Sequence, residues 1–280
     1  MDTRLSPATF NRIREYVHLT AGIIIGPEKA AMVVTRLWRR LDKMGCADFD
    51  AYFKFVTSKE GEEERGHMLD LLTTNETYFF REPAHFTRLK SQMLPSLGKR
   101  RPRVWCAAAS TGEEPYSLAM MLHDSLGSRA WDLLATDISS KALTQARRGL
   151  YRMERLDQMP QEFLKRYCRR GVGEYDGMLV IDRELREQVQ FQQHNLLESL
   201  QYDASEKNDG FDIIFLRNVL IYFDQRTKQR VLDHLVASLR PGGWLITGHC
   251  ESLFGLNLPL QQLSPSVYRN PDHLPARRPA

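Results

Sequence analysis

Features that mark disulfide-rich, zinc-finger or membrane proteins are missing from this sequence of 280 residues. The cysteines Cys46, Cys106, Cys168 and Cys250 lie far apart without a C-x-x-C pair, which argues against a cysteine zinc site or a disulfide framework. The longest apolar runs, such as Phe211–Leu216, fall far short of the ~20 residues that span a bilayer. The first residues also lack the pattern of a secretory signal. We therefore expect a soluble, cytoplasmic protein.

A strong excess of charge is missing as well. The 39 basic and 35 acidic residues leave a net charge of only +4 at pH 7. A nucleic-acid-binding protein would show a dominant basic surface, so this balance argues against such a partner and supports a mild preference for acidic ones. With 42% hydrophobic residues, the chain can bury a sizeable core in one large domain or two small ones.

Residues 1–88 are predicted to form an all-helical N-terminal domain, because apolar residues recur there at helical spacing and no strand pattern appears. Ser6 and Pro7 are typical of the start of a first helix. A second helix is expected from Pro27 to Met44, and a third follows Asp48. The second helix has an apolar stripe predicted to comprise Val34, Leu37 and Leu41.

Two stretches of this region are predicted to be irregular. The charged stretch Ser58–Gly66 is expected to be a loop ahead of a short helix over His67–Leu72. Residues 89–102 combine basic residues with proline and glycine, which indicates a linker between domains.

From residue 103 the pattern changes to strand-like runs that alternate with amphipathic helices, as in α/β domains with a mainly parallel sheet. Residues 151–188 interrupt this rhythm with glycines and short β-like pieces, so we predict a small inserted subdomain there. The α/β domain is expected to cover residues 103–270, ahead of a disordered tail at 271–280. Its predicted strands are Arg103–Ala108, Trp131–Thr136, Val189–Gln192, Phe211–Leu216 and Trp244–Thr247.

A ligand site is predicted where the first strand turns into a helix, since such folds bind ligands at the carboxyl ends of their strands. Small residues at Ala107–Gly112 let a ligand approach the backbone closely. A G-x-G-x-x-G fingerprint is absent, and Glu113 and Glu114 at the helix start would repel a pyrophosphate. A ligand with an ammonium or sulfonium group fits better. The alternative is a tight turn of the kind that any α/β domain contains.

Polar residues follow the next strands at the same edge. Asp137 can accept hydrogen bonds from both hydroxyls of a ribose; alternatively it caps the next helix, a role that Ser139 can also fill. The amide of Asn195 can bind an adenine edge while Leu196 packs on its face, and Arg217-Asn218 lies at the mouth of the site. A nucleoside site with an acidic turn and no phosphate-binding groups points to S-adenosylmethionine.

At these residues the sequence resembles the CheR family, the chemotaxis receptor glutamate methyltransferases. The matching stretches are Thr73–Glu82, Ala108–Ser117, Ala135–Ile138 and Phe215–Phe223; they occur in family order, and the resemblance covers about residues 5–270. It implies an all-helical N-terminal domain and a class I, Rossmann-like methyltransferase domain that carries a small antiparallel β-subdomain. The implied activity is transfer of a methyl group from S-adenosylmethionine to receptor glutamates.

The resemblance also implies roles for single residues. Arg81 and Tyr222 correspond to residues that the family places near the transferred methyl group, where they are expected to orient the substrate carboxylate. One sequence does not decide between Glu113 and Glu114, and we favour Glu114. The cofactor contacts of the family fall on Asn75, Thr77, Arg81, Glu114, Asp137, Asn195, Leu196, Arg217 and Asn218.

Partner sites follow from charge and from the resemblance together. The second predicted helix has one basic face formed by Arg36, Arg39, Arg40 and Lys43, which is either a solvated face or a docking surface. In the family this domain meets the glutamate-rich methylation helices of chemoreceptors, which favours docking. In many relatives the β-subdomain also captures a C-terminal receptor peptide as an added strand. We expect a monomer that binds no nucleic acid and does not insert into membranes.

No metal is expected, because the histidines are scattered without H-E-x-x-H spacing. The sequence His249-Cys250-Glu251 could suggest a metal site or a nucleophile, but packing and capping of a strand end explain it better. Two other functions compete with the main one. The chain could methylate another protein or a small acid, or it could be a non-catalytic module that senses the cofactor.

Overall fold

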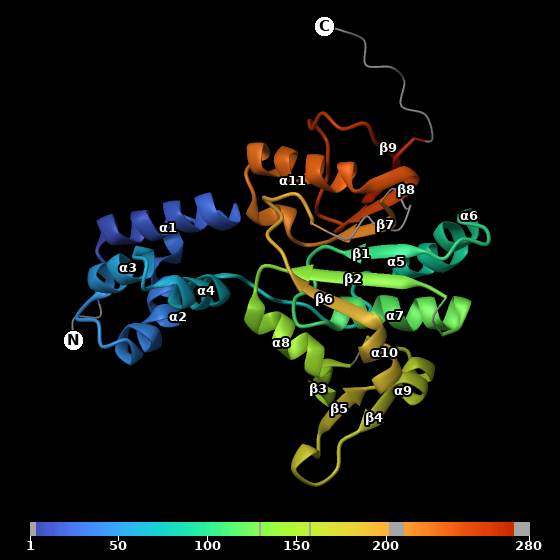
Figure 1. The fold of residues 1–280 in the computed structure, drawn as a ribbon, viewed down its shortest axis with the longest axis horizontal. Coiled ribbons are helices and arrows are strands. Elements are labelled where there is room, and N and C mark those ends of the chain that lie inside the picture. Colours follow the sequence, from blue (N-terminus) through green and yellow to red (C-terminus); the bar gives the residue numbers. More distant parts are fainter. Residues whose placement is uncertain (1–3, 129, 157, 202–209, 272–280) are drawn as a thin grey trace, which may run out of the picture.

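The computed structural model describes residues 4–128, 130–156, 158–201 and 210–271. A helical unit lies beside an α/β unit, from which a small β-subdomain projects (Figure 1). The predicted fold class is confirmed. The predicted tail lies outside the described residues from residue 272 onward.

Two helices of the helical unit begin directly after the residues that the sequence indicated as their starts, Ser6 and Asp48. The Ser6 hydroxyl accepts a hydrogen bond from Thr9 N at 3.1 Å, and the Asp48 carboxylate accepts one from Ala51 N at 2.8 Å. Each bond satisfies a backbone donor that has no partner inside its helix. The elements are α1 (Pro7–Ala21), η1 (Pro27–Lys29), α2 (Ala30–Lys43), α3 (Phe49–Thr57) and α4 (Glu62–Leu72).

The second helix differs from its prediction in its start and in its buried stripe. A 3-10 turn, η1, precedes α2, and the buried residue at the start of the stripe is Val33 rather than Val34. Val33, Leu37 and Leu41 recur at intervals of four residues and so lie on one face, whereas Val34 is turned by about 100° and is half-buried.

The prediction of a loop over Ser58–Gly66 is wrong in its second half, because α4 begins at Glu62. Glutamates occupy the whole first turn of α4, where they are stabilised by the positive end of the helix dipole. One of them, Glu64, is buried and forms an ion pair with Arg40 of α2. The charged residues that predicted a loop therefore form the first turn of α4, and Glu64 links this helix to α2.

The predicted linker 89–102 is helical over its first half. Its apolar residues Leu89, Met93, Leu94 and Leu97 are buried in the core of the α/β unit, while Lys90 is exposed. Composition was misleading because the other basic residues, Lys99, Arg100 and Arg101, follow this helical half and do not belong to it. The helices here are α5 (Pro83–Arg88), the π-helix η2 (Leu89–Met93) and α6 (Leu94–Ser96), and residues 73–82 connect α4 to α5.

The α/β unit is built on a 7-stranded sheet with the order β6-β2-β1-β7-β8-β10-β9. The first five strands in this order pair in parallel and the last two antiparallel. All the predicted strands are present, with ends shifted by a few residues. Their bounds are β1 (Arg103–Cys106), β2 (Asp132–Asp137), β6 (Val189–Gln193), β7 (Phe211–Leu216), β8 (Leu239–Thr247), β9 (Gln261–Ser264) and β10 (Val267–Arg269).

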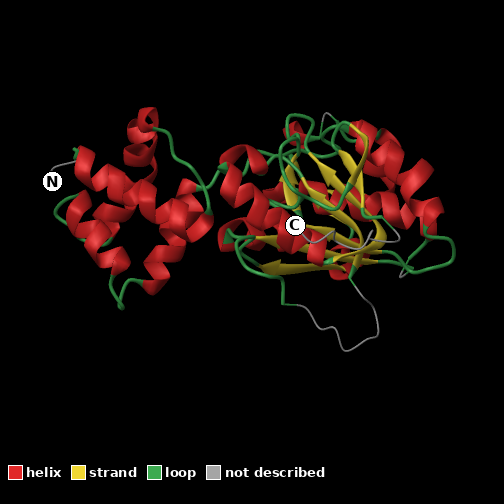
Figure 2. Cartoon of the chain, turned by 90° about the horizontal axis from the view of Figure 1, so that it is seen from above, coloured by secondary structure: helices red, strands yellow, loops and turns green. Residues whose placement is uncertain are grey.

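Helices cover both faces of the sheet (Figure 2). The strand order shows that the chain reverses its direction of winding between β1 and β7. Such a switch point opens a crevice at the carboxyl ends of the strands. The covering helices include α7 (Glu113–Leu126), α8 (Ser140–Arg148) and α11 (Gln225–Ala237), with the 3-10 turn η5 (Leu220–Tyr222) ahead of α11.

The inserted region forms a separate 3-stranded sheet with the order β3-β5-β4. Both pairings are antiparallel, as the resemblance implied. Its elements are β3 (Leu150–Arg152), η3 (Met153–Arg155), α9 (Gln161–Tyr167), β4 (Cys168–Arg170), η4 (Gly173–Tyr175), β5 (Met178–Ile181) and α10 (Arg183–Gln188). Within the described ranges, no helix combines the length and the apolar character needed to cross a membrane.

Candidate functional site

A pocket lies at the carboxyl ends of β1, β2, β6 and β7, and the helical unit closes it from one side through Ala21 and Ile23. The side chains of Ala107 and Ala108 after β1 leave room for a ligand close to the backbone. The structure brings to this pocket every residue that was predicted to bind cofactor or to act in catalysis. These are Asn75, Thr77, Arg81, Glu114, Asp137, Asn195, Leu196, Arg217, Asn218 and Tyr222.

The two glutamates at the start of α7 point in different directions, because successive helical residues are turned by about 100°. Glu114 lines the pocket, whereas the Glu113 carboxylate is fully buried and accepts a hydrogen bond from the Thr111 hydroxyl at 2.6 Å. Burial raises the pKa of Glu114, and the charge of Arg217 opposes this rise. The geometry therefore favours Glu114 as the residue that faces a ligand.

Asp137 at the end of β2 is held by backbone groups. Its two carboxylate oxygens accept hydrogen bonds from Ser110 N at 2.7 Å and from Ser139 N at 2.9 Å. The hydroxyl of Ser139 caps α8 by accepting from Ala142 N at 3.1 Å, so the helix does not need Asp137 as its cap. Burial raises the pKa of Asp137, although these backbone hydrogen bonds oppose it. The remaining lone pairs can accept hydrogen bonds from ligand hydroxyls.

Arg217 is the centre of a buried ion-pair network in the wall of the pocket. Its side chain is 0% exposed and contacts Glu114 Oε2 at 2.6 Å, Glu82 Oε2 at 3.1 Å and the Arg81 carbonyl at 2.5 Å. Burial disfavours its charged form, but the two carboxylates outweigh that effect and raise the pKa of Arg217. Glu82 was missed as a site residue although it lies inside a stretch that carries the resemblance, because its pairing with Arg217 is not visible in one sequence.

Asn218 has a left-handed backbone (φ 59°) that is stabilised on both sides. Its N–H donates to Glu251 Oε2 at 2.7 Å, and its Nδ2 donates to Glu82 Oε1 at 3.3 Å. Glu251 also accepts from Gly248 N at 2.6 Å just beyond the end of β8. The capping role expected for this part of His249-Cys250-Glu251 is thereby confirmed for Glu251.

Asn195 joins the two units and keeps part of its amide for a ligand. Its Nδ2 donates to the Thr20 carbonyl at 2.7 Å, and its Oδ1 accepts from Leu197 N at 3.1 Å. An amide has two donor hydrogens and two acceptor lone pairs. One of each remains, so the expected contact with an adenine edge stays a prediction.

Arg81 and Tyr222 supply hydrogen-bond donors from different walls of the pocket. Arg81 Nη1 donates to the Glu76 carbonyl at 3.1 Å, and its guanidinium lies 5.6 Å from the centroid of the Tyr78 ring. Within the described part of the chain, its other guanidinium nitrogens and the Tyr222 hydroxyl make no hydrogen bond. Both side chains are only partly buried, so these donors can reach a group that enters from solvent.

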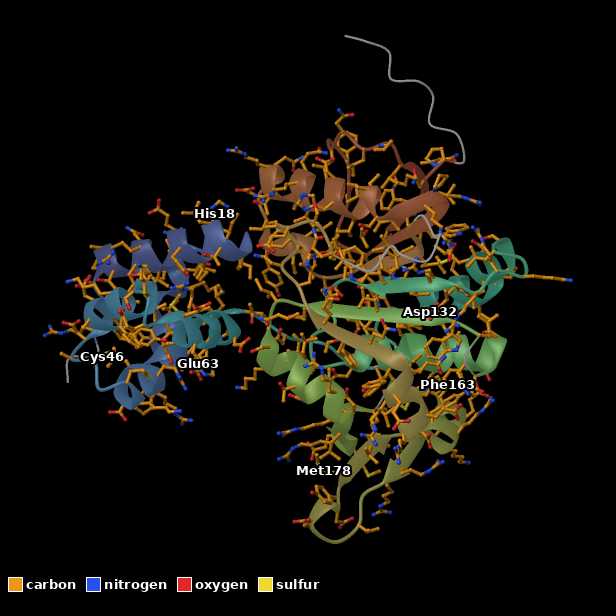
Figure 3. The ribbon with its side chains drawn as sticks, in the orientation of Figure 1. His18, Cys46, Glu63, Asp132, Phe163 and Met178 are labelled. Atoms are coloured by element: carbon orange, nitrogen blue, oxygen red, sulfur yellow. The ribbon has the colours of Figure 1, made fainter. Side chains whose placement is uncertain are left out.

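Close contacts hold the end of α1 against the α/β unit. Ile24 N donates to the Tyr222 carbonyl at 2.9 Å, and His18 Nε2 lies 2.9 Å from Asp224 Oδ2. His18 is on the part of α1 nearest the α/β unit (Figure 3). Gly22 ends α1 with φ +74°, and a Cβ there would lie 2.7 Å from Thr227 Cγ2. Both the left-handed backbone and the closeness of Thr227 therefore favour glycine at position 22.

The predicted docking face on α2 is only partly available, since Arg40 is engaged inside the helical unit. Its Nε donates to Glu64 Oε1 at 2.9 Å and its Nη2 pairs with Glu64 Oε2. The Tyr52 hydroxyl donates to Glu64 Oε1 at 2.7 Å. The Arg40 side chain is accordingly only 18% exposed.

Arg36 is engaged in a similar way, because its Nη1 donates to the carbonyls of Leu71 at 3.1 Å and Thr73 at 2.9 Å. These contacts satisfy acceptors at the C-terminal end of α4. Arg39 and Lys43 are exposed. Of the predicted basic face, only these two residues make no hydrogen bond or ion pair within the described part of the chain, although the Arg39 guanidinium lies 5.6 Å from the centroid of the Trp38 ring.

Comparisons with known proteins cover both units. Residues 8–73 match the family model described as CheR methyltransferase, all-alpha domain, and residues 75–268 match CheR methyltransferase, SAM binding domain. The chain is 41% identical to the chemotaxis protein methyltransferase of Escherichia coli (strain K12) over 94% of this chain and 91% of that one. It is 41% identical to chemotaxis protein methyltransferase 2 of Pseudomonas aeruginosa, over 92% and 91% of the chains. For the chemotaxis protein methyltransferase of Borreliella burgdorferi the identity is 30%, over 96% of each chain.

Proposed function

Because the chain belongs to the CheR methyltransferase family, we propose that it transfers the methyl group of S-adenosylmethionine to glutamate side chains on the cytoplasmic helices of chemoreceptors. The chain is an S-adenosylmethionine-dependent methyltransferase. The observation that carries the choice of a carboxylate substrate is the pair of donors, Arg81 and Tyr222, in the wall of the cofactor pocket. We assign the reaction to the cytoplasm, where these receptor helices lie.

The residues of the pocket fit the proposed cofactor. Asp137 offers acceptors for the ribose hydroxyls, and Asn195 retains a donor and an acceptor for the adenine edge. Glu114 supplies a carboxylate for a cationic group, held in place by Arg217. When bound, S-adenosylmethionine supplies a methyl group on a sulfonium centre, which is electrophilic without further activation.

The substrate carboxylate needs no general base, since the pKa of a glutamate is about 4.3 and the group is ionised at pH 7. Arg81 and Tyr222 are proposed to hold this carboxylate by hydrogen bonds and fix its direction of approach. Orientation of this kind contributes up to ~7–11 kcal/mol to lowering a barrier. The Arg81 guanidinium is partly exposed and also contacts the Glu76 carbonyl and the Tyr78 ring. It is therefore proposed to orient the substrate carboxylate without fully neutralising its charge.

We propose that Arg39 and Lys43 form the part of α2 that contacts the acidic receptor helices. The edge strands β3 and β4 of the small sheet are the candidates for adding a C-terminal receptor peptide. The unit of function is proposed to be a monomer, because the predicted cofactor-binding and catalytic residues all line a pocket formed by one chain.

The proposal is tested with methyl-labelled S-adenosylmethionine and a chemoreceptor cytoplasmic fragment. Mild base hydrolyses glutamate methyl esters, so the expected readout is volatile labelled methanol that requires both the protein and the fragment. A fragment whose methylation-site glutamates are replaced by alanine is the matched control and is expected to release none. Bound cofactor without release from any receptor fragment would contradict the proposed substrate. Label transfer to a small acid instead would support the competing methyltransferase reaction.

A further inference from the structure

Three side chains with metal-binding atoms converge beside the pocket. Glu82 precedes α5, His85 lies in α5 and His249 follows β8. Their ligand atoms all lie within 4.8 Å of one another, with Glu82 Oε2 3.4 Å from His85 Nδ1 and 3.9 Å from His249 Nε2. Ligands at ~2.0–2.1 Å from a tetrahedral ion are about 3.3 Å apart. A small movement of His249, which is 51% exposed, would complete this geometry.

The orientation of His85 makes its Nδ1 a lone-pair donor. The residue is 3% exposed, and its Nε2 lies 2.8 Å from Ser266 Oγ. Ser266 donates its hydroxyl hydrogen to the Pro265 carbonyl at 2.6 Å, so it accepts from the Nε2–H of His85. Nδ1 of the neutral ring is then unprotonated. Metal-binding histidines have this arrangement, in which the second ring nitrogen donates to a fixed partner.

The surroundings of the lone pair on His85 Nδ1 favour a bound cation. Nδ1 of His85 is buried and has no hydrogen-bond partner in the described ranges, and the nearby charged atom is a carboxylate oxygen of Glu82. Two electron-rich atoms that face each other without a hydrogen between them are unfavourable in a buried position. Either a proton or a metal ion between them would remove the conflict.

A metal ion is the stronger candidate, because a second imidazole, that of His249, also faces Glu82 Oε2, with its Nε2 at 3.9 Å.

We propose that Glu82, His85 and His249 bind a divalent transition-metal ion of the zinc type beside the cofactor pocket. Two imidazoles and one carboxylate favour Zn²⁺, Co²⁺ or Ni²⁺ over Mg²⁺ or Ca²⁺, which prefer oxygen ligands. Exposure of His249 gives the ion a path from solvent and room for water as a fourth ligand. The positive charges of Arg217 and Arg88 oppose the ion, so we expect a dissociation constant of order micromolar rather than nanomolar.

The test is calorimetric titration of the full chain with Zn²⁺, repeated with Co²⁺ to record the visible absorption of a tetrahedral complex. The Cys250→Ser variant serves as the background, because this exposed thiol lies next to His249. We expect one equivalent to bind, and His249→Ala to weaken binding by about tenfold or more. His85→Gln, which tests the buried ligand, is expected to have a similar effect.

His67→Ala is the matched control, because His67 is an exposed histidine 3.7 Å from Glu63 in the helical unit. It is expected to leave the affinity unchanged. The proposal is overturned if Zn²⁺ does not bind up to millimolar concentration, or if His249→Ala binds it as tightly as the background. Loss of binding in the Cys250→Ser background itself would assign the ion to the thiol and also overturn it. Methyl transfer is not part of the readout, so failure here leaves the proposed function untouched.

Discussion

Replacing Arg40 by alanine is expected to destabilise the helical unit by about 3 kcal/mol, the lower end of the cost of breaking a buried ion pair. The Glu64 side chain is only 4% exposed, and it receives hydrogen bonds from Arg40 and from Tyr52. Without Arg40 a buried carboxylate keeps a single neutral donor. The lower end applies because Arg40 is itself 18% exposed, so water can partly replace it.

The cost of Arg40→Ala should depend on pH in a defined direction. Burial disfavours the ionised form of Glu64, but the hydrogen bonds from Arg40 and Tyr52 outweigh it and lower the pKa of Glu64. A lowered carboxyl pKa contributes stability above its ordinary value and loses it as the pH falls through the folded value. The difference between wild type and variant is therefore expected to be full at pH 7 and to shrink below about pH 4.

Urea unfolding followed by circular dichroism measures both effects. With a slope of about 1–3 kcal/mol per molar urea, a loss of about 3 kcal/mol lowers the midpoint of the helical transition by about 1–3 M. Arg39→Ala is the control, because Arg39 is exposed on the same helix, and it should change the free energy of unfolding by less than about 0.5 kcal/mol. Equal shifts for the two variants, or a difference that grows on acidification, would refute the reasoning.

Other predictions concern the pocket and its partners. Arg39→Glu with Lys43→Glu should raise the KM for a receptor fragment severalfold with unchanged cofactor affinity in calorimetry; an unchanged KM would remove these residues from the docking surface. Arg81→Ala should lower kcat by at least tenfold and cofactor affinity much less, so equal losses would contradict a substrate-orienting role. Asp137→Asn should weaken cofactor binding by about 1.5–3 kcal/mol. Both carboxylate oxygens of Asp137 accept hydrogen bonds from backbone N–H groups and are proposed to accept from the ribose as well, whereas an asparagine has only one oxygen that can accept. Gly22→Ala should weaken cofactor binding by displacing the helical unit; unchanged affinity and melting temperature would show that the contact tolerates a side chain.

The parts of the fold that the sequence predicted depend on local signals. Ser6, Asp48 and Ser139 cap their helices through hydrogen bonds to residues three positions later, so the pattern and its cause lie within one turn. The strands of the parallel sheet are similarly recognisable, since a strand such as Phe211–Leu216 is buried along its whole length and is therefore apolar throughout.

The parts that were missed depend on partners far away in the chain. Glu64 belongs to a helix rather than a loop partly because Arg40, 24 residues earlier, neutralises it, and nothing in the stretch Ser58–Gly66 shows that. The pairing of Glu82 with Arg217 and its approach to His249 likewise follow from the topology of the sheet. Charged residues whose partners are distant in the sequence therefore reveal their role only when the fold has placed those partners beside them.

The pocket wall contains residues from both units, with Ala21 and Ile23 on one side and the strand-end residues on the other. A molecule bound there acts as a crosslink between two bodies that are otherwise joined by residues 73–82 and by contacts such as that of Gly22. Saturation with the substrate form or the product form of the cofactor should therefore raise the melting temperature of both units together.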